Sequence, residues 1–197
     1  SATGNLAWAG LALMTLGDAT QDPRYAAGAA TIGRWVVENA ADGKTPAGFT
    51  GGLYGYDDQA QHLTWKSTEH NTDLAALFDW LARLQPDAGW QDQAAKARSF
   101  VAAQWSRKER HFLVGTLPDG TTPNAKNSGI DSELWPLLLA KTEPAWQAGL
   151  GHVEQHYAVG AGFDFNDDRD GIWSEGTAQA ALVYRALGME AKSDRSL

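Results

Sequence analysis

The sequence contains no cysteine among its 197 residues, which excludes disulfide bonds, a thiol nucleophile and thiolate metal ligands. Basic residues are scarce as well: 16 Lys and Arg stand against 24 Asp and Glu, giving a net charge of −8. An acidic surface repels nucleic acids and anionic membranes, so neither is expected as a partner. No apolar run approaches the roughly 20 residues that a membrane-spanning helix needs.

The hydrophobic fraction of 43% is that of a folded domain, and nine tryptophans are present. Tryptophan combines a flat apolar surface with a polar N–H group, so it suits sugar-binding clefts as well as cores. The chain begins with Ser, which is compatible with a mature, trimmed or excised protein. We expect a secreted or periplasmic location, with the cytoplasm as the alternative.

Hydrophobic periodicity predicts seven helices, separated by turns or by long glycine-rich connections. The first, third, fifth and seventh are apolar on most sides, whereas the second, fourth and sixth are amphipathic. We predict one domain over residues 1–188 and a polar tail over 189–197. The predicted helices cover residues 5–16, 25–39, 69–84, 90–105, 131–141, 143–157 and 175–187.

This alternation indicates an all-α repeat of helical hairpins. The odd-numbered helices would form an inner ring and the even-numbered helices an outer one. The starts of the inner helices would then open on one face, together with the long connections. We therefore expect the binding chemistry on that face.

Three strings carry a resemblance to a known family: Thr-Gly-Asn-Leu-Ala-Trp, Ser-Thr-Glu-His-Asn and Asp-Gly-Ile-Trp-Ser-Glu-Gly-Thr-Ala-Gln. With the helical hairpins, they resemble uncharacterised bacterial members of the six-hairpin (α/α)6-toroid superfamily of glycosidases and polysaccharide lyases. Seven helices make about three and a half hairpins, where a full toroid has six. The resemblance implies a fragment, an open ring, or a ring completed by further hairpins of a longer chain or of a second chain.

Candidate catalytic residues are carboxylates near the predicted starts of the inner helices. Hydrolysis of a glycosidic bond usually needs two carboxyl groups, one as acid and one as nucleophile or base. Glu69 and Glu175 lead, followed by Asp73, Asp131 and Glu133. We favour a pair split between helices, with Glu69 facing Glu175 or Asp131. The alternative is that these carboxylates only stabilise the helices, through the favourable interaction of negative charge with the helix N-terminus.

Other polar and aromatic residues near the same helix starts are candidates for binding a poly- or oligosaccharide. Asn5, His70, Asn71 and Gln179 would hydrogen-bond hydroxyls, and Trp8, Trp135 and Trp173 would stack on sugar rings, with Tyr54 and Tyr56 on a loop beside them.

Two other functions remain open. Lyases resembling this fold use Asn with His or Tyr beside a uronate, a role that would fall here on His70, Asn71, Tyr54 and Tyr56. A non-catalytic carbohydrate-binding or scaffold module is the other alternative.

No cofactor is required by this chemistry, but one acidic loop has calcium-like spacing. Its alternating oxygen ligands would be Asp164, Asn166, Asp168 and Asp170. His152 and His156 are spaced as in some zinc sites, yet they lie on an outer amphipathic helix, which favours a solvated face.

Overall fold

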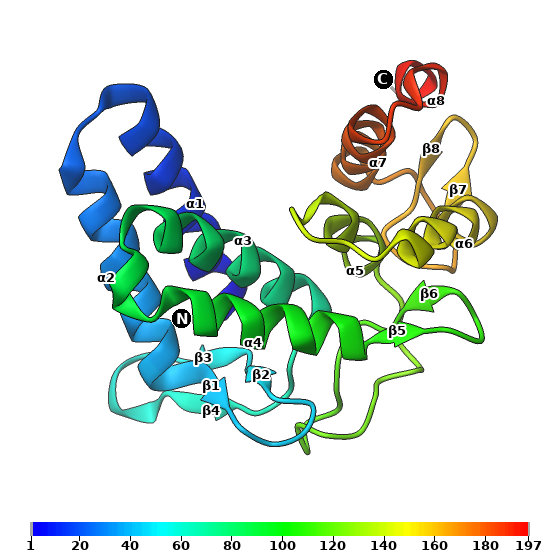
Figure 1. The fold of residues 1–197 in the computed structure, drawn as a ribbon. Helices are drawn as coiled ribbons and strands as arrows, with labels where there is room; N and C mark the ends of the chain where they lie inside the picture. The colour runs from blue at the N-terminus through cyan, green and yellow to red at the C-terminus, as the bar shows by residue number, and fades with distance from the viewer. Residues whose placement is uncertain (1, 197) are drawn as a thin grey trace. The chain divides into compact units, whose positions relative to one another are not determined.

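The computed structural model describes residues 2–196 and is mainly helical (Figure 1), which confirms the all-α prediction. The chain divides into two compact units. Unit 1 comprises residues 1–103 and 115–123, and unit 2 comprises residues 104–114 and 124–197. The single domain over 1–188 stays a prediction. No helix in the described part of the chain has both the length and the apolar character that crossing a bilayer requires.

Unit 1 is built from two antiparallel helical hairpins. Helix α1 packs against α2 and α3, and α3 packs against α4. The elements are α1 (Thr3–Thr20), α2 (Pro23–Ala40), β1 (Ala41–Asp42), β2 (Gly48–Phe49), β3 (Gly52–Tyr54), η1 (Asp57–Gln59), β4 (Gln61–Leu63), α3 (Thr68–Leu84), η2 (Pro86–Ala88) and α4 (Trp90–Ala103).

Helix α3 is the core of unit 1. Ser67 caps its start by accepting a hydrogen bond from the His70 N–H. Apolar residues follow on most sides, and the Phe78 ring stacks on Trp90 at 5.6 Å. Helix α1 differs from its predicted burial, because Trp8 and Leu16 are 47% and 46% exposed. Within unit 1 only α2 and α3 pack extensively against α1, so its remaining surface meets solvent.

Unit 2 has shorter and less regular helices. Helix α7 packs against α5 and α8, and α5 packs against α6. The elements are β5 (Trp105–Ser106), β6 (His111–Phe112), α5 (Ile130–Leu134), η3 (Trp135–Leu138), η4 (Pro144–Ala148), α6 (Gly149–His156), β7 (Ala158–Val159), β8 (Gly162–Phe163), α7 (Ser174–Ala186) and α8 (Glu190–Arg195).

Two predicted features of unit 2 differ from the structure. The helix expected to run to Lys141 ends at Leu134, because Pro136 has no N–H to donate to the Ser132 carbonyl and the chain tightens into a 3-10 turn. Within the segment 189–197, expected as a polar tail, Glu190–Arg195 form α8, and Ser193 of this helix is buried; Leu197 lies outside the described residues.

Each of α2, α4 and α6 is followed by a two-residue antiparallel hairpin: β1–β2, β5–β6 and β7–β8. Each hairpin ends in a buried phenylalanine, namely Phe49, Phe112 or Phe163. The N–H of that phenylalanine donates to a side-chain oxygen of the fourth residue of the next odd-numbered helix. We call this hydrogen bond the helix-start clamp. The acceptors are Asn71 Oδ1, Glu133 Oε2 and Thr177 Oγ1, each at 2.9 Å.

The loop between β1 and β2 is held by a buried lysine just before α3. The ammonium of Lys66 donates to the carbonyls of Lys44 and Pro46, at 2.8 and 2.7 Å, and pairs with Asp42 at 2.9 Å. A buried ammonium needs such partners, because desolvation would otherwise be too costly. The start of α3 is therefore fixed both by the helix-start clamp and by this loop.

Candidate functional site

Three carboxylates occupy the same place in three helices. Glu69, Asp131 and Glu175 are the second residues of α3, α5 and α7. Unpaired N–H groups and the helix dipole favour negative charge at this place. Asp131 and Glu175 belong to unit 2, whereas Glu69 belongs to unit 1, so its pairing with either of them stays a prediction.

Asp131 has the surroundings of an acid–base group. Its carboxyl is half-buried, and its Oδ1 atom is buried without a hydrogen-bond partner in residues 2–196. Burial raises the pKa of Asp131, a hydrogen bond from Gln179 opposes that rise, and the nearby charge of Glu175 adds to it. Glu175 itself is exposed. Two carboxylates with such different surroundings can divide the roles of acid and base.

Gln179 lies one turn after Glu175 in α7 and therefore on the same face. It is 5% exposed, and its Oε1 atom has no hydrogen-bond partner in the described residues. An unsatisfied buried amide oxygen is unfavourable. The predicted role of Gln179, a hydrogen bond to a sugar hydroxyl, stays a prediction.

The connection between β8 and α7 links the starts of the two helices. The Ile130 N–H donates to the Phe165 carbonyl at 2.9 Å, and the Trp173 N–H donates to the Phe163 carbonyl at 2.8 Å. The rings of Phe165 and Trp173 meet edge to face at 5.2 Å, and Phe165 is 46% exposed. This aromatic pair gives the predicted Trp173 a neighbour that sequence reasoning missed. The only signal for Phe165 was an aromatic residue within an acidic loop.

Two predicted site residues have a structural role instead. Asn71 accepts from the Phe49 N–H and donates to the Phe49 and Ser67 carbonyls at 2.9 and 2.8 Å. Glu133 is 1% exposed and accepts from the Phe112 N–H. Because both side chains form helix-start clamps, the structure favours this role over substrate binding for Asn71 and over catalysis for Glu133.

His70 is enclosed at the start of α3. Its ring lies 5.5 Å from that of Trp65, and a Cβ atom at position 4, which is glycine, would come within 2.5 Å of the His70 ring. Burial lowers the pKa of His70 to about 4. The imidazole is therefore neutral at neutral pH and has little room to approach a substrate. Asp73, 5% exposed in the same helix, keeps its candidate role as a prediction.

The other predicted binding residues are distributed over both units. In unit 1, Tyr54 and Tyr56 are 72% and 88% exposed, and Asn5 and Trp8 are also exposed. In unit 2, Trp135 is half-buried where α5 passes into η3. Their contacts with sugar remain predictions.

The acidic loop brings three of its four predicted calcium ligands together. Carboxylate oxygens of Asp164, Asp168 and Asp170 lie within 4.8 Å of one another. Asp164 also accepts hydrogen bonds from the Phe165 and Gly171 N–H groups, at 2.6 and 3.3 Å, so the cluster has an internal structural role. Calcium binding, with Asn166 as a fourth ligand, stays a prediction.

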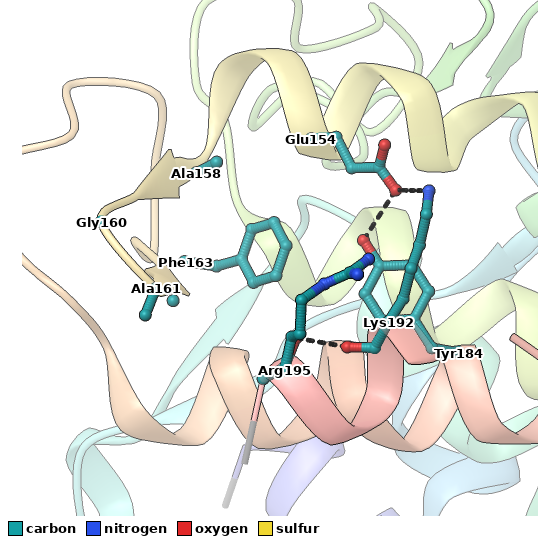
Figure 2. A pocket seen from close by; sticks show the side chains of 10 residues that line it. Glu154, Ala158, Gly160, Ala161, Phe163, Tyr184, Lys192 and Arg195 are labelled. Atoms are coloured by element: carbon teal, nitrogen blue, oxygen red, sulfur yellow. Dashed lines mark hydrogen bonds and ion pairs between the residues drawn. The ribbon is translucent and has the colours of Figure 1, made fainter. Parts of the chain in front are cut away.

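A cavity of about 380 Å³ lies elsewhere in unit 2 (Figure 2). Within it, Glu154 accepts from the Tyr184 hydroxyl at 2.9 Å and from Lys192 at 2.5 Å. Tyr184 is near the end of α7, whereas Glu175 is at its start, about 14 Å away along the helix axis. The cavity is therefore separate from the carboxylates at the helix starts.

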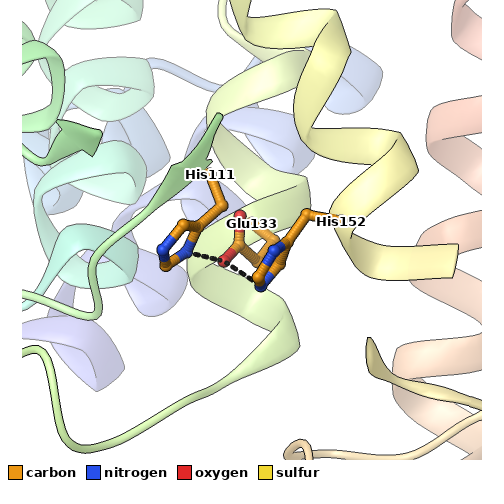
Figure 3. A group of neighbouring side chains, drawn as sticks. All are labelled: His111, Glu133 and His152. Atoms are coloured by element: carbon orange, nitrogen blue, oxygen red, sulfur yellow. Dashed lines mark hydrogen bonds and ion pairs between the residues drawn. The ribbon is translucent and has the colours of Figure 1, made fainter. Parts of the chain in front are cut away.

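A histidine cluster forms around Glu133 (Figure 3). Sequence reasoning considered only His152 with His156; the structure adds His111 and Glu133. Burial raises the pKa of Glu133, and the hydrogen bond with Glu133 raises that of His111. Burial and the neighbouring histidines lower the pKa of His152 to about 4.

No family model matches the sequence, and no curated protein matches it. Solved structures do match its fold. An alpha-amylase from Clostridium perfringens matches with a TM-score of 0.76 and 13% identity, and the match covers 100% of this chain and 59% of the amylase chain. A glycoside hydrolase family 76 mannosidase from Bacteroides thetaiotaomicron matches with a TM-score of 0.62 and 15% identity, and the match covers 95% of this chain and 53% of the mannosidase chain. A D-mannose isomerase matches with a TM-score of 0.69 and 12% identity, and the match covers 100% of this chain and 57% of the isomerase chain.

These matches show that the chain shares part of the fold of six-hairpin glycosidase-like proteins, as the resemblance implied. Identities this low show the fold and not the activity. The chain spans little more than half the length of each matched structure. A complete toroid is therefore larger than the part formed by these residues.

Proposed function

We propose that this chain provides part of a carbohydrate-active site that hydrolyses glycosidic bonds, with Asp131 and Glu175 as the paired carboxylates. The observation that carries the proposal is the raised pKa of a half-buried Asp131 beside the exposed Glu175. Two matched structures are named as an alpha-amylase and a mannosidase, which supports a glycan substrate.

In this mechanism Asp131 is the general acid. A carboxyl group with a raised pKa keeps its proton at higher pH and can give it to the leaving glycosidic oxygen. Glu175 then acts as the nucleophile or as the base that activates water. The unpaired Oε1 of Gln179 would accept from a sugar hydroxyl, and the Phe165–Trp173 pair would pack against a sugar face.

Further hairpins, from a longer chain or a second chain, would complete the ring around this site. Glu69 and Asp73 stay predicted catalytic candidates of unit 1. A uronate lyase has less support, because His70 is enclosed and Asn71 is engaged in the helix-start clamp. The other alternative, a non-catalytic carbohydrate-binding module, would bind sugar through the Phe165–Trp173 pair without cleaving it.

The test is to incubate the chain with α-glucans, mannans and uronate polymers and to measure new reducing ends and ultraviolet absorbance. Asp131→Asn and Glu175→Gln are compared with Glu143→Gln, an exposed carboxylate of unit 2 that serves as the control. We expect reducing ends without absorbance, and losses of roughly 10²–10⁴-fold in both site variants but not in the control. In the parent, activity should fall as pH rises through the raised pKa of Asp131.

Three results would overturn the proposal. Absorbance from a new double bond would identify a lyase. Sugar binding without turnover by the folded parent chain would identify a binding module. Activity retained in both Asp131→Asn and Glu175→Gln would show that the reaction uses other carboxylates.

A further inference from the structure

Three potential metal ligands meet in unit 2 although they are distant in sequence. His111 is on β6, Glu133 on α5 and His152 on α6 (Figure 3). The His111 Nδ1 atom lies 3.0 Å from Glu133 Oε1, and the His152 Nε2 atom lies 3.9 Å from the same oxygen. One ligand atom from each residue lies within 4.8 Å of the other two.

Glu133 has a negative charge and a second carboxylate oxygen that the helix-start clamp does not require. Asn71 and Thr177 make the equivalent hydrogen bond with neutral groups, at the same 2.9 Å distance. Glu133 uses only Oε2 for this bond, which leaves Oε1 directed at the two imidazoles. A carboxylate buried to 1% exposure is unfavourable unless a cation or hydrogen bonds compensate it. The clamp therefore does not explain why this position carries a charge.

The ligand types are those of a transition-metal site. Imidazole nitrogen and carboxylate oxygen bind zinc at about 2.0–2.2 Å, so tetrahedral ligand atoms lie roughly 3.3 Å apart. The two measured distances to Oε1, 3.0 and 3.9 Å, lie on either side of that separation. Glu109 Oε2 lies 3.9 Å from the His111 Nε2 atom, where a second carboxylate can orient a metal-bound imidazole.

Metal binding requires the imidazole rings to reorient, because the lone pairs of stacked rings lie in nearly parallel planes. The His111 and His152 rings are stacked, with centroids 4.1 Å apart and an interplanar angle of 12°. Both side chains retain some exposure, 17% and 20%, so rotation is not blocked on every side. The His156 ring stacks on the other face of this pair, with its centroid 4.2 Å from that of His152, but it does not belong to the group whose ligand atoms lie within 4.8 Å.

We propose that His111, Glu133 and His152 bind a divalent transition-metal ion of the zinc class, which joins β6, α5 and α6. Binding displaces the proton shared by His111 Nδ1 and Glu133 Oε1, so the metal takes over the compensation of the buried carboxylate. This site is independent of the proposed hydrolysis by Asp131 and Glu175.

The test is a titration of the metal-free, untagged chain with Co²⁺, followed by its visible absorption, and then displacement by Zn²⁺. The variants are Glu133→Gln and His152→Ala, with His62→Ala, an exposed histidine of unit 1, as the control. Glu133→Gln keeps an acceptor for the Phe112 N–H, as Asn71 does in α3, so unit 2 should remain folded. Circular dichroism checks this.

We expect one equivalent of Co²⁺ with the intense absorption of a low-coordinate site, and displacement by Zn²⁺. Each ligand variant should bind at least about tenfold more weakly, while the His62 variant should match the parent. Equal binding by the parent and the folded Glu133→Gln and His152→Ala variants would overturn the proposal. So would the absence of saturable binding, which would identify the cluster as a buried ion pair only.

Discussion

Helices α3 and α5 begin alike and then diverge. Each has an acidic second residue, Glu69 or Asp131, and a fourth residue that accepts from a buried phenylalanine N–H. Helix α3 continues for 17 residues, whereas α5 ends after five and passes into a 3-10 turn at Pro136. The two helices therefore share the way in which they start and differ in their length.

The same comparison separates structural polar residues from functional ones. The fourth position is occupied by Asn71, Glu133 or Thr177, and in each case it serves the backbone of a hairpin. The second residue of α3, α5 and α7 is a carboxylate, whereas in α1 it is Gly4. Asn71 and Glu133 have hydrogen-bond partners inside the protein, whereas the Oδ1 atom of Asp131 has none in the described residues.

The largest effect should come from removing the phenylalanines of the helix-start clamps. Phe49→Ala and Phe112→Ala delete side chains that are 0% and 1% exposed, and each should lower the free energy of unfolding by about 3–5 kcal/mol. Urea denaturation measures the loss. Phe165→Ala, at 46% exposure, is the control and should lose much less. A loss in the control as large as in Phe49→Ala and Phe112→Ala would show that burial of these two rings does not decide the stability.

An intermediate effect should distinguish the polar halves of two clamps. Asn71→Ala leaves the buried Phe49 N–H without an acceptor and should lower the free energy of unfolding by about 1–3 kcal/mol. Glu133→Gln retains an acceptor and relieves a buried charge, so in metal-free protein it should change stability by less than about 1 kcal/mol. Denaturation of both variants measures the difference. The comparison fails if Glu133→Gln is the more destabilising of the two.

The smallest effect on stability at neutral pH should come from the titration of one histidine in each unit, His70 and His111. Burial lowers the pKa of His70 from 6.5 to about 4, so its contribution to stability is present above 6.5 and is lost as pH falls towards 4. The Glu133 hydrogen bond raises the pKa of His111, so its contribution is present below 6.5 and is lost as pH rises through the raised pKa. Imidazole proton shifts in an NMR titration measure both. A His70 that titrates at 6.5 would contradict its enclosure.

Much of the fold could be read from the sequence because helix periodicity is a local property. The predicted starts of α3 and α7 lie within one residue of the observed ones. The failures were local as well. The helix predicted over residues 131–141 ends at Leu134, because Pro136 interrupts it and the chain passes into a 3-10 turn.

The clamps were missed for a different reason. The distance in sequence between the phenylalanine and its acceptor is 22, 21 and 14 residues in the three repeats. No fixed spacing links them, since connections of unequal length lie between them. Polar residues at helix starts therefore looked equivalent, and Asn71 and Glu133 were grouped with Asp131 and Glu175.

The sequence by itself determined the helical repeat and the carboxylate near the start of each inner helix from α3 onward, because periodicity and helix-start chemistry act over a few neighbouring residues. Only the tertiary structure decided which polar groups are used internally and which have unsatisfied atoms. It brought Glu175 close enough to raise the pKa of Asp131, and it gathered His111 and His152 around Glu133. Those neighbours depend on the paths of long connections, and burial then sets how strongly the assembled charges interact.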